Sequence, residues 1–140
     1  MMIGKSFIKE DCVMIRCVCL VDRRDNALRL VQVRHRKKMY FPGGKLEQGE
    51  GLKAALIREV KEELQLELKE EDIEYIGSVT GPAYPQPNEK TELHGFRTTF
   101  PINWSEIEIA AEITHIDWVN MDDHQRIAPA VLNWIEQYET

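Results

Sequence analysis

The sequence predicts an α/β (α+β) fold in which two helices cover the faces of a mixed β-sheet. Strand-like segments rich in β-branched and apolar residues recur along the chain, and two helical segments lie among them, one central and one terminal. The 140 residues contain no repeat, linker or low-complexity tract, and their number is close to that of an average domain. We therefore expect a single domain, residues 1–140.

The expected strands are residues 12–21, 28–33, 73–80, 92–100 and 113–119. Turn-forming residues at 22–26 separate the first two strands, which predicts a hairpin. Strong helix formers without a proline predict a helix over residues 51–64. Apolar residues at helical spacing predict a second helix over residues 128–138. The adjacent glycines Gly43 and Gly44 predict a sharply bent loop before the first helix.

The composition limits the partners and the compartment. The chain has 18 Lys plus Arg against 24 Asp plus Glu, a net charge of −6, so we expect no binding to polymeric nucleic acid. No apolar run has the length of a membrane span, and the N-terminal segment lacks the apolar stretch of a secretory signal. We therefore expect a cytoplasmic protein without a membrane partner. The cysteines lack zinc-site spacing and are expected to be reduced core thiols: Cys12, Cys17 and Cys19.

The central helix carries three glutamates on its apolar side. At 3.6 residues per turn, Glu59, Glu62 and Glu63 fall within an arc of about 100°. Leu52 and Leu56 lie on the same side, whereas a solvated charge run would lie opposite the apolar residues. The three carboxylates can therefore converge on one point.

This placement of acids is electrostatically unfavourable. Glu59 and Glu63 form a like-charge pair one turn apart, and all three charges lie in the negative C-terminal half of the helix, at a total cost of about 1 to 3 kcal/mol. A hard divalent cation would neutralise the cluster, and it prefers carboxylate oxygens. We expect Mg²⁺, with Mn²⁺ as the second choice. The alternative is a structural ion-pair cluster in which Arg58 offers partial relief.

A longer pattern surrounds these acids. Residues 44–66 resemble the Nudix box, G-x5-E-x7-R-E-U-x-E-E-x-G-U, in which U is a bulky aliphatic residue. Only Gln65 departs from it, where the box has a glycine that ends the helix in a left-handed conformation. A non-glycine there is expected to cost about 1 kcal/mol or to shift the helix end. The matching polar and glycine positions are Gly44, Glu50, Arg58, Glu59, Glu62 and Glu63.

The resemblance implies a Nudix-type α/β/α sandwich with a central mixed β-sheet. It also implies a metal-dependent hydrolase that cleaves a phosphoanhydride (pyrophosphate) bond in a nucleoside di- or triphosphate or a nucleoside-diphosphate-X derivative. Carried over by position, Glu59, Glu62 and Glu63 would hold the divalent ions, with the carbonyl of Gly43 or Gly44 as a further ligand.

Further roles follow from the same resemblance. Arg58 would orient a carboxylate by a bidentate pair, and Glu50 would contact the metal site indirectly or brace the loop. Family members differ in which carboxylate takes the proton from the attacking water, so a box glutamate, Glu59 or Glu62, and a later acid both stay open. The later candidate is Glu112, as base or metal ligand, and the weaker candidates are Glu106 and Glu108.

Three residues beside the glycine loop are expected to contact the substrate: Arg34, Gly44 and Lys45. Arg34 ends a predicted strand and begins a basic run that would reach substrate phosphates. The candidates for stacking on a base are Tyr84, Phe96, Trp104 and Trp118. MutT-like enzymes that remove oxidised guanine nucleotides read the base with an asparagine near the start of the last helix. The aligned residue is Ala128, which weakens the expectation of that specificity.

The rival function is a Nudix-fold module that binds a nucleotide without cleaving it. Such modules often lose box carboxylates or carry an appended DNA-binding domain. The box acids are complete, and the expected single domain leaves no room for an appendage. We therefore expect a hydrolase of a small nucleotide derivative. The sequence leaves open the base, the sugar, the bond that is cleaved and whether the protein is a homodimer.

Overall fold

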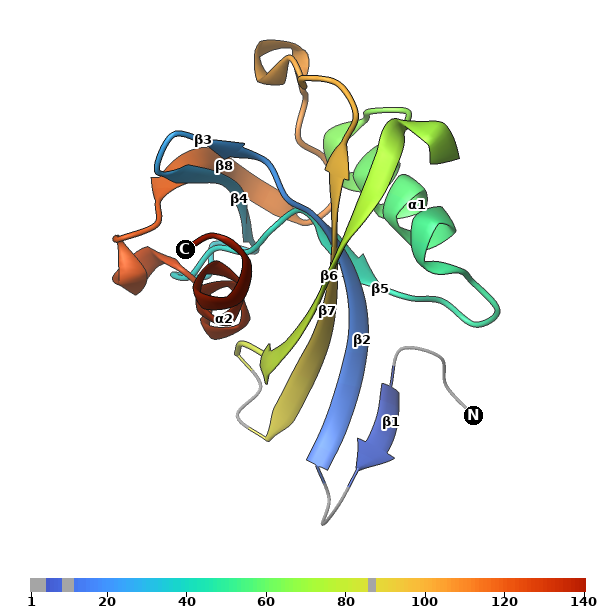
Figure 1. The fold of residues 1–140 in the computed structure, drawn as a ribbon, viewed down its shortest axis with the longest axis vertical. Coiled ribbons are helices and arrows are strands. Elements are labelled where there is room, and N and C mark those ends of the chain that lie inside the picture. The colour runs from blue at the N-terminus through green and yellow to red at the C-terminus, as the bar shows by residue number, and fades with distance from the viewer. Residues whose placement is uncertain (1–4, 9–11, 86–87) are drawn as a thin grey trace.

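The computed structural model describes residues 5–8, 12–85 and 88–140. The helices are α1 (Leu52–Leu64) and α2 (Pro129–Tyr138). The strands are β1 (Lys5–Ile8), β2 (Cys12–Leu20), β3 (Arg23–Arg24), β4 (Ala27–Val33), β5 (Gly43–Lys45), β6 (Ile73–Pro82), β7 (Glu89–Thr98) and β8 (Ile113–Asn120). Both predicted helices are present, and the predicted class of a mixed sheet with two helices is confirmed (Figure 1).

The larger sheet is mixed. Its strands lie in the order β1-β2-β7-β6, and β5 also pairs with β2. The central pair, β2 and β7, is parallel, whereas β1, β5 and β6 pair antiparallel with their neighbours. Strand β7 therefore joins segments that are far apart in the sequence, and its pairing with β2 builds the centre of the fold.

The predicted hairpin between residues 12–21 and 28–33 is wrong. Strand β4 belongs to a second, antiparallel sheet with the order β3-β4-β8, and β2 pairs with β1, β5 and β7 instead. The turn at 25–26 joins β4 to the short β3. The physical reason is that β2 is apolar on both faces, with Val18 and Cys19 both buried, and such a strand belongs in the centre of a covered sheet.

Helix α1 covers one face of the larger sheet and contacts β2 and β5. Its buried residues form one stripe: Ala55, Leu56, Val60 and Leu64. The helix ends at Leu64, and Gln65 takes the left-handed conformation with φ 55° and ψ 32°. The substituted glycine position has therefore not shifted the helix end, and Gln65 keeps the strained geometry that glycine would adopt freely.

Helix α2 and the second sheet cover the other face of the larger sheet (Figure 1). Neighbouring residues on β7 show the two faces, because side chains alternate along a strand. Phe96 packs in the cluster under α1, whereas a Cβ at Gly95 would lie 2.1 Å from the Trp134 ring of α2. No helix within the described residues is long and apolar enough to cross a membrane.

Candidate metal and phosphate site

The predicted glycine loop is in part a strand, because Gly43–Lys45 form β5, which pairs with β2 and lies against the acidic side of α1. The Gly43 N–H donates a hydrogen bond to Glu63 Oε1 at 2.9 Å. A Cβ at Gly44 would lie 2.5 Å from the Glu59 carboxyl carbon, and a Cβ at Gly43 would lie 2.0 Å from the Val18 carbonyl oxygen. Gly43 also has φ +148°, a conformation that other residues rarely adopt. The two glycines therefore let β5 lie between β2 and the two carboxylates.

Arg58 joins the glycine loop to the helix. Its Nε and Nη2 donate to the two carboxylate oxygens of Glu50 at 2.7 and 2.9 Å. Its Nη1 donates to Glu59 Oε1 at 2.8 Å, and Nη2 also donates to the Lys45 carbonyl at 3.0 Å. Glu50 in turn accepts the Glu47 N–H at 2.9 Å. The bidentate pair with Glu50 fixes the guanidinium, which then holds the Glu59 carboxylate in place.

The three box glutamates differ in environment. Burial raises the pKa of Glu63 to about 8, with smaller contributions from Glu59, Glu62 and Glu112, although the Gly43 N–H opposes the rise. Burial also raises the pKa of Glu59, and the Arg58 hydrogen bond and charge counteract it. The Glu62 side chain is 54% exposed and lies 3.5 Å from Arg58. The structure therefore brings Glu59 and Glu63 to the glycine loop and leaves Glu62 near solvent.

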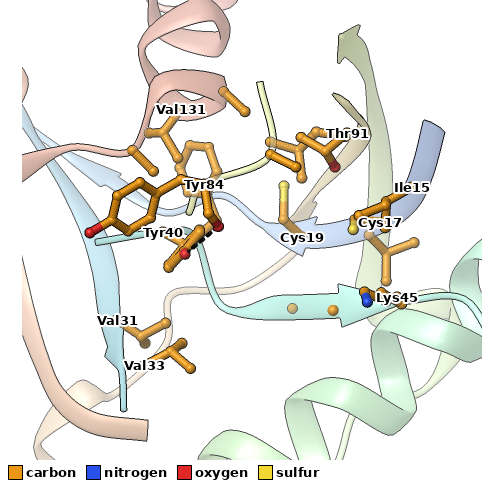
Figure 2. A pocket seen from close by; sticks show the side chains of 18 of the residues that line it. Ile15, Cys17, Cys19, Val31, Val33, Tyr40, Lys45, Tyr84, Thr91 and Val131 are labelled. Carbon is orange, nitrogen blue, oxygen red and sulfur yellow. Dashed lines mark hydrogen bonds between the residues drawn. The ribbon is translucent and has the colours of Figure 1, made fainter. Parts of the chain in front are cut away.

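A cleft of about 490 Å³ opens beside these residues. One end contains the acids and the glycine loop, and the lining of the other end is mostly apolar apart from the two tyrosines and Arg36, which donates to the Tyr40 hydroxyl at 3.3 Å. In Figure 2 the Tyr40 and Tyr84 rings lie beside one another, far from Lys45 on β5. Tyr40 donates its hydroxyl hydrogen to the Tyr84 carbonyl at 2.7 Å. A volume of this size suits a nucleotide-sized ligand with one anionic and one weakly polar part.

Two further predicted site residues meet at the cleft. Arg34 and Glu112 both line it and form an ion pair, and the Arg34 N–H donates to the Glu112 carbonyl at 3.0 Å. The Arg34 and Ala111 backbones have φ of 50° and 54°, uncommon values for residues other than glycine. Lys45 also lines the cleft, whereas Glu106 and Glu108 do not.

The aromatic candidates separate into two groups. Tyr84 lines the cleft, as does Ala128, which is buried at the start of α2. Phe96 is buried under α1, and Trp104 packs edge-on against Trp118 with their ring centroids 6.3 Å apart. Of the four stacking candidates, only Tyr84 is therefore placed to touch a ligand in this cleft.

The cleft-lining residues that sequence reasoning did not propose include Tyr40, Cys17 and Thr91. Cys19 is buried in the core as expected, but Cys17 is only partly buried, and the Cys12 side chain lies outside the described part of the structure. Burial raises the pKa of the Cys17 thiol, and the neighbouring Thr91 side chain opposes the rise. Tyr40 could have been suspected from its position just before the glycine loop, whereas no sequence pattern marks Thr91.

The donor chemistry fits a hard divalent cation. Glu59 and Glu63 supply carboxylate oxygens beside the β5 backbone, and their raised pKa values show unfavourable burial of charge. Across the described ranges, no three His, Cys, Asp or Glu side chains are gathered so that they could hold a metal ion. Mg²⁺ does not require such a cage, because it commonly binds one or two carboxylates together with waters and substrate phosphates.

The fold and this site define a class of α/β protein with a ligand cleft. At one end of this cleft, the carboxylates of a helix lie beside a glycine loop. A family comparison gives the same result, because the NUDIX domain model matches residues 14–138. The chain therefore belongs to the Nudix hydrolase family.

Solved structures show the same fold. The E. coli ORF135 protein has a TM-score of 0.64 at 24% identity, over 90% of this chain and 89% of that chain. A MutT NUDIX hydrolase from Burkholderia pseudomallei has a TM-score of 0.69 at 19% identity, over 89% and 98%.

A third similar structure contains a metal ion. It is a bifunctional NMN adenylyltransferase/ADP ribose pyrophosphatase from Francisella tularensis, complexed with AMP and a Mn ion. Its TM-score is 0.63 at 19% identity, over 87% of this chain and 41% of that chain. A comparison with curated protein sequences found no match.

Proposed function

We propose that the protein uses Mg²⁺ or Mn²⁺ to hydrolyse a phosphoanhydride bond in a nucleoside di- or triphosphate or a nucleoside-diphosphate-X derivative. The observation that carries this proposal is the pair of partly buried carboxylates, Glu59 and Glu63, packed against the glycine loop at one end of the cleft. A structural ion-pair cluster would not require a cleft beside it, and it would give Glu63 a basic partner, whereas Glu63 accepts a hydrogen bond from the Gly43 N–H.

Glu59 and Glu63 would hold the cation, with Glu62 and the carbonyl of Gly43 or Gly44 as further ligands. The bound cation would neutralise phosphate oxygens and the charge that develops on them during hydrolysis. Arg58 keeps the Glu59 carboxylate oriented, since its own position is fixed by Glu50.

Other charged residues of the cleft would bind the substrate phosphates or accept a proton. Arg34 and Lys45 line the cleft and would bind phosphate oxygens, which an arginine can do through two parallel hydrogen bonds. A carboxylate must accept the proton of the attacking water. Glu112 is our first candidate because its side chain is 56% exposed and lines the cleft, and Glu59 and Glu62 are the alternatives.

The apolar end of the cleft would receive the base or the group X. Tyr84 offers a ring face, and Ala128 offers no side-chain hydrogen bond where MutT-like enzymes place an asparagine. The described lining residues beside Tyr40 include the Arg36 guanidinium, which donates to the Tyr40 hydroxyl at 3.3 Å, but no amide or carboxylate side chain that could read the edge of a base by paired hydrogen bonds. ADP-ribose and nucleotide sugars therefore belong in the test beside the nucleoside triphosphates.

The test is hydrolysis of a substrate panel, with the products identified by chromatography, because ADP-ribose and nucleotide sugars are split into two phosphomonoesters and release neither phosphate nor pyrophosphate. The panel contains nucleoside triphosphates, dinucleoside polyphosphates, nucleotide sugars and ADP-ribose, each with Mg²⁺, Mn²⁺ or EDTA. We expect turnover of one class with metal and none with EDTA. Glu59→Gln and Glu63→Gln should each remove most of this turnover.

Glu136→Gln is the matched control, because Glu136 is an exposed glutamate on α2 outside the cleft lining. It should turn over substrate at the wild-type rate. Binding of a nucleotide without turnover of any panel member would support the non-catalytic module instead. Normal rates in both cleft variants would remove the proposed metal site.

A further inference from the structure

Arg34 and Glu112 form an ion pair with each other. The proposed reaction would use both side chains, Arg34 to bind a phosphate and Glu112 to accept a proton. Arg34 follows β4, and Glu112 precedes β8, so their positions depend on the pairing of these strands. Both residues line the same cleft as Glu59 and Glu63. As long as they are paired, the guanidinium is not free for phosphate and the carboxylate is not free to accept a proton.

A ligand can displace Glu112 from its ion pair with Arg34. The side chains of Arg34 and Glu112 are 61% and 56% exposed, and pairs in such surroundings shift an equilibrium by no more than about fivefold. A diphosphate carries more charge than one carboxylate and presents oxygens that match both arms of a guanidinium. The exchange of Glu112 for phosphate on Arg34 is therefore favourable in charge and in geometry.

The backbone allows this exchange without moving the strands. The Arg34 N–H donates to the Glu112 carbonyl at 3.0 Å, and this backbone bond involves neither side chain. The Ala110 N–H donates to the Glu63 carbonyl at 2.8 Å, so the segment that carries Glu112 lies against the end of α1 before any rearrangement.

We propose that Arg34 masks Glu112 in the free protein, and that a substrate phosphate unmasks it by taking over the Arg34 guanidinium. This inference rests on the proposed function for its substrate, and it adds an order of events. Phosphate binding at Arg34 comes first, and a free Glu112 carboxylate in the cleft follows from it. Binding of the correct anion would then be coupled to the release of a proton acceptor.

The test is a double-mutant cycle on binding rather than on turnover. Methylenediphosphonate, a diphosphate analogue with a non-hydrolysable bridge, is titrated by calorimetry at fixed ionic strength in EDTA. The proteins are the wild type, Arg34→Gln, Glu112→Gln and the double variant. Circular dichroism and thermal melts check that all four are folded, which we expect because both side chains are exposed.

If Arg34 masks Glu112, the effect of each substitution on binding should depend on whether the other residue is present. Arg34→Gln should weaken binding, and Glu112→Gln should tighten binding two- to fivefold only while Arg34 is present. Equal tightening in both backgrounds would mean simple charge repulsion and would overturn the proposal. So would unchanged or weaker binding in Glu112→Gln, or an Arg34→Gln variant that binds as well as the wild type.

The cycle also separates this inference from the proposed function. Turnover of the substrate panel by the wild type, together with no coupling between the two residues, would leave the hydrolase in place and remove the masking. Coupling without turnover of any substrate would keep the anion-dependent exchange and remove the hydrolase.

Discussion

At the scale of single residues, Glu63 has the most strongly perturbed environment among the box glutamates. The usual pKa of its carboxyl group is 4.5, and burial raises it to about 8 in the folded protein. The unfolded chain therefore releases this proton at a lower pH than the folded chain. Between about pH 4.5 and 8 the folded state binds more protons, so the stability of the metal-free protein falls as pH rises.

Glu63→Gln should remove this pH dependence. The amide oxygen can still accept the Gly43 N–H, but the side chain no longer ionises. One unit of pKa shift corresponds to about 1.4 kcal/mol, or roughly 3 to 5 °C in a chain of this length. In EDTA at pH 8.5 the variant should melt at least that much above the wild type, with a smaller gain at pH 5. Thermal melts across this range check it, and a variant that melts lower at pH 8.5 would contradict the electrostatic argument.

At the scale of elements, the contact between β5 and α1 predicts different effects for the two adjacent glycines. In Gly43→Ala the new Cβ meets the Val18 backbone at a φ of +148°, and neither can move easily. We expect a loss of at least about 3 kcal/mol in the free energy of unfolding. In Gly44→Ala the three atoms nearest to the new Cβ all belong to the end of the Glu59 side chain, which can turn away.

Gly44→Ala should therefore stay folded and lose activity. A displaced Glu59 carboxylate would no longer lie where Arg58 holds it, and displacements of about 1 Å can cost about a hundredfold in rate. Urea unfolding and kcat/KM on the identified substrate measure the two effects. The prediction is contradicted if Gly44→Ala is the less stable of the two variants or if its rate is unchanged.

The C-terminal end of α1 allows two substitutions of the same residue to be compared. Gln65 has φ 55°, and its side-chain Nε2 donates to the Glu108 carbonyl at 3.1 Å. Alanine and glycine both remove that hydrogen bond, but only glycine relieves the left-handed strain. Gln65→Gly should be more stable than Gln65→Ala by about 1 kcal/mol in urea unfolding. Equal stabilities would mean that this position carries no strain.

Local patterns were sufficient to predict most elements but not the pairing of strands. The periodic residues of α1 and α2 gave both helices within about one residue, because a helix is stabilised by contacts along a short segment. The segment 12–21 was correctly predicted as a strand and wrongly paired with 28–33. Its parallel partner, β7, begins only at Glu89, and no turn signal marks so distant a pairing.

At the scale of the whole molecule, the sequence predicted those parts of the candidate site whose residues lie close together along the chain, in one helix and one loop. Helical geometry predicted that Glu59, Glu62 and Glu63 share one side of the helix, and the resemblance placed the glycines beside them. The structure brings Glu59 and Glu63 to the glycines and leaves Glu62 54% exposed. The ion pair of Arg34 with Glu112 depends on the pairing of β4 with β8, and the contact of Tyr40 with Tyr84 depends on how both sheets pack, so spacing predicts neither. The apolar end of the cleft could not be derived for the same reason.

Cation binding should connect this site to the stability of the whole fold. A ligand at ten times its dissociation constant that binds only the folded state adds about 1.4 kcal/mol, or roughly 5 °C in melting temperature. We expect Mg²⁺ to raise the melting temperature by that amount, and more at pH 8.5 than at pH 6, because a proton on Glu63 competes with the cation. Glu59→Gln and Glu63→Gln should lose the effect, and Glu136→Gln should keep it. A shift that persists in both cleft variants would place the cation elsewhere on this acidic chain, whose net charge of −6 attracts cations without a specific site.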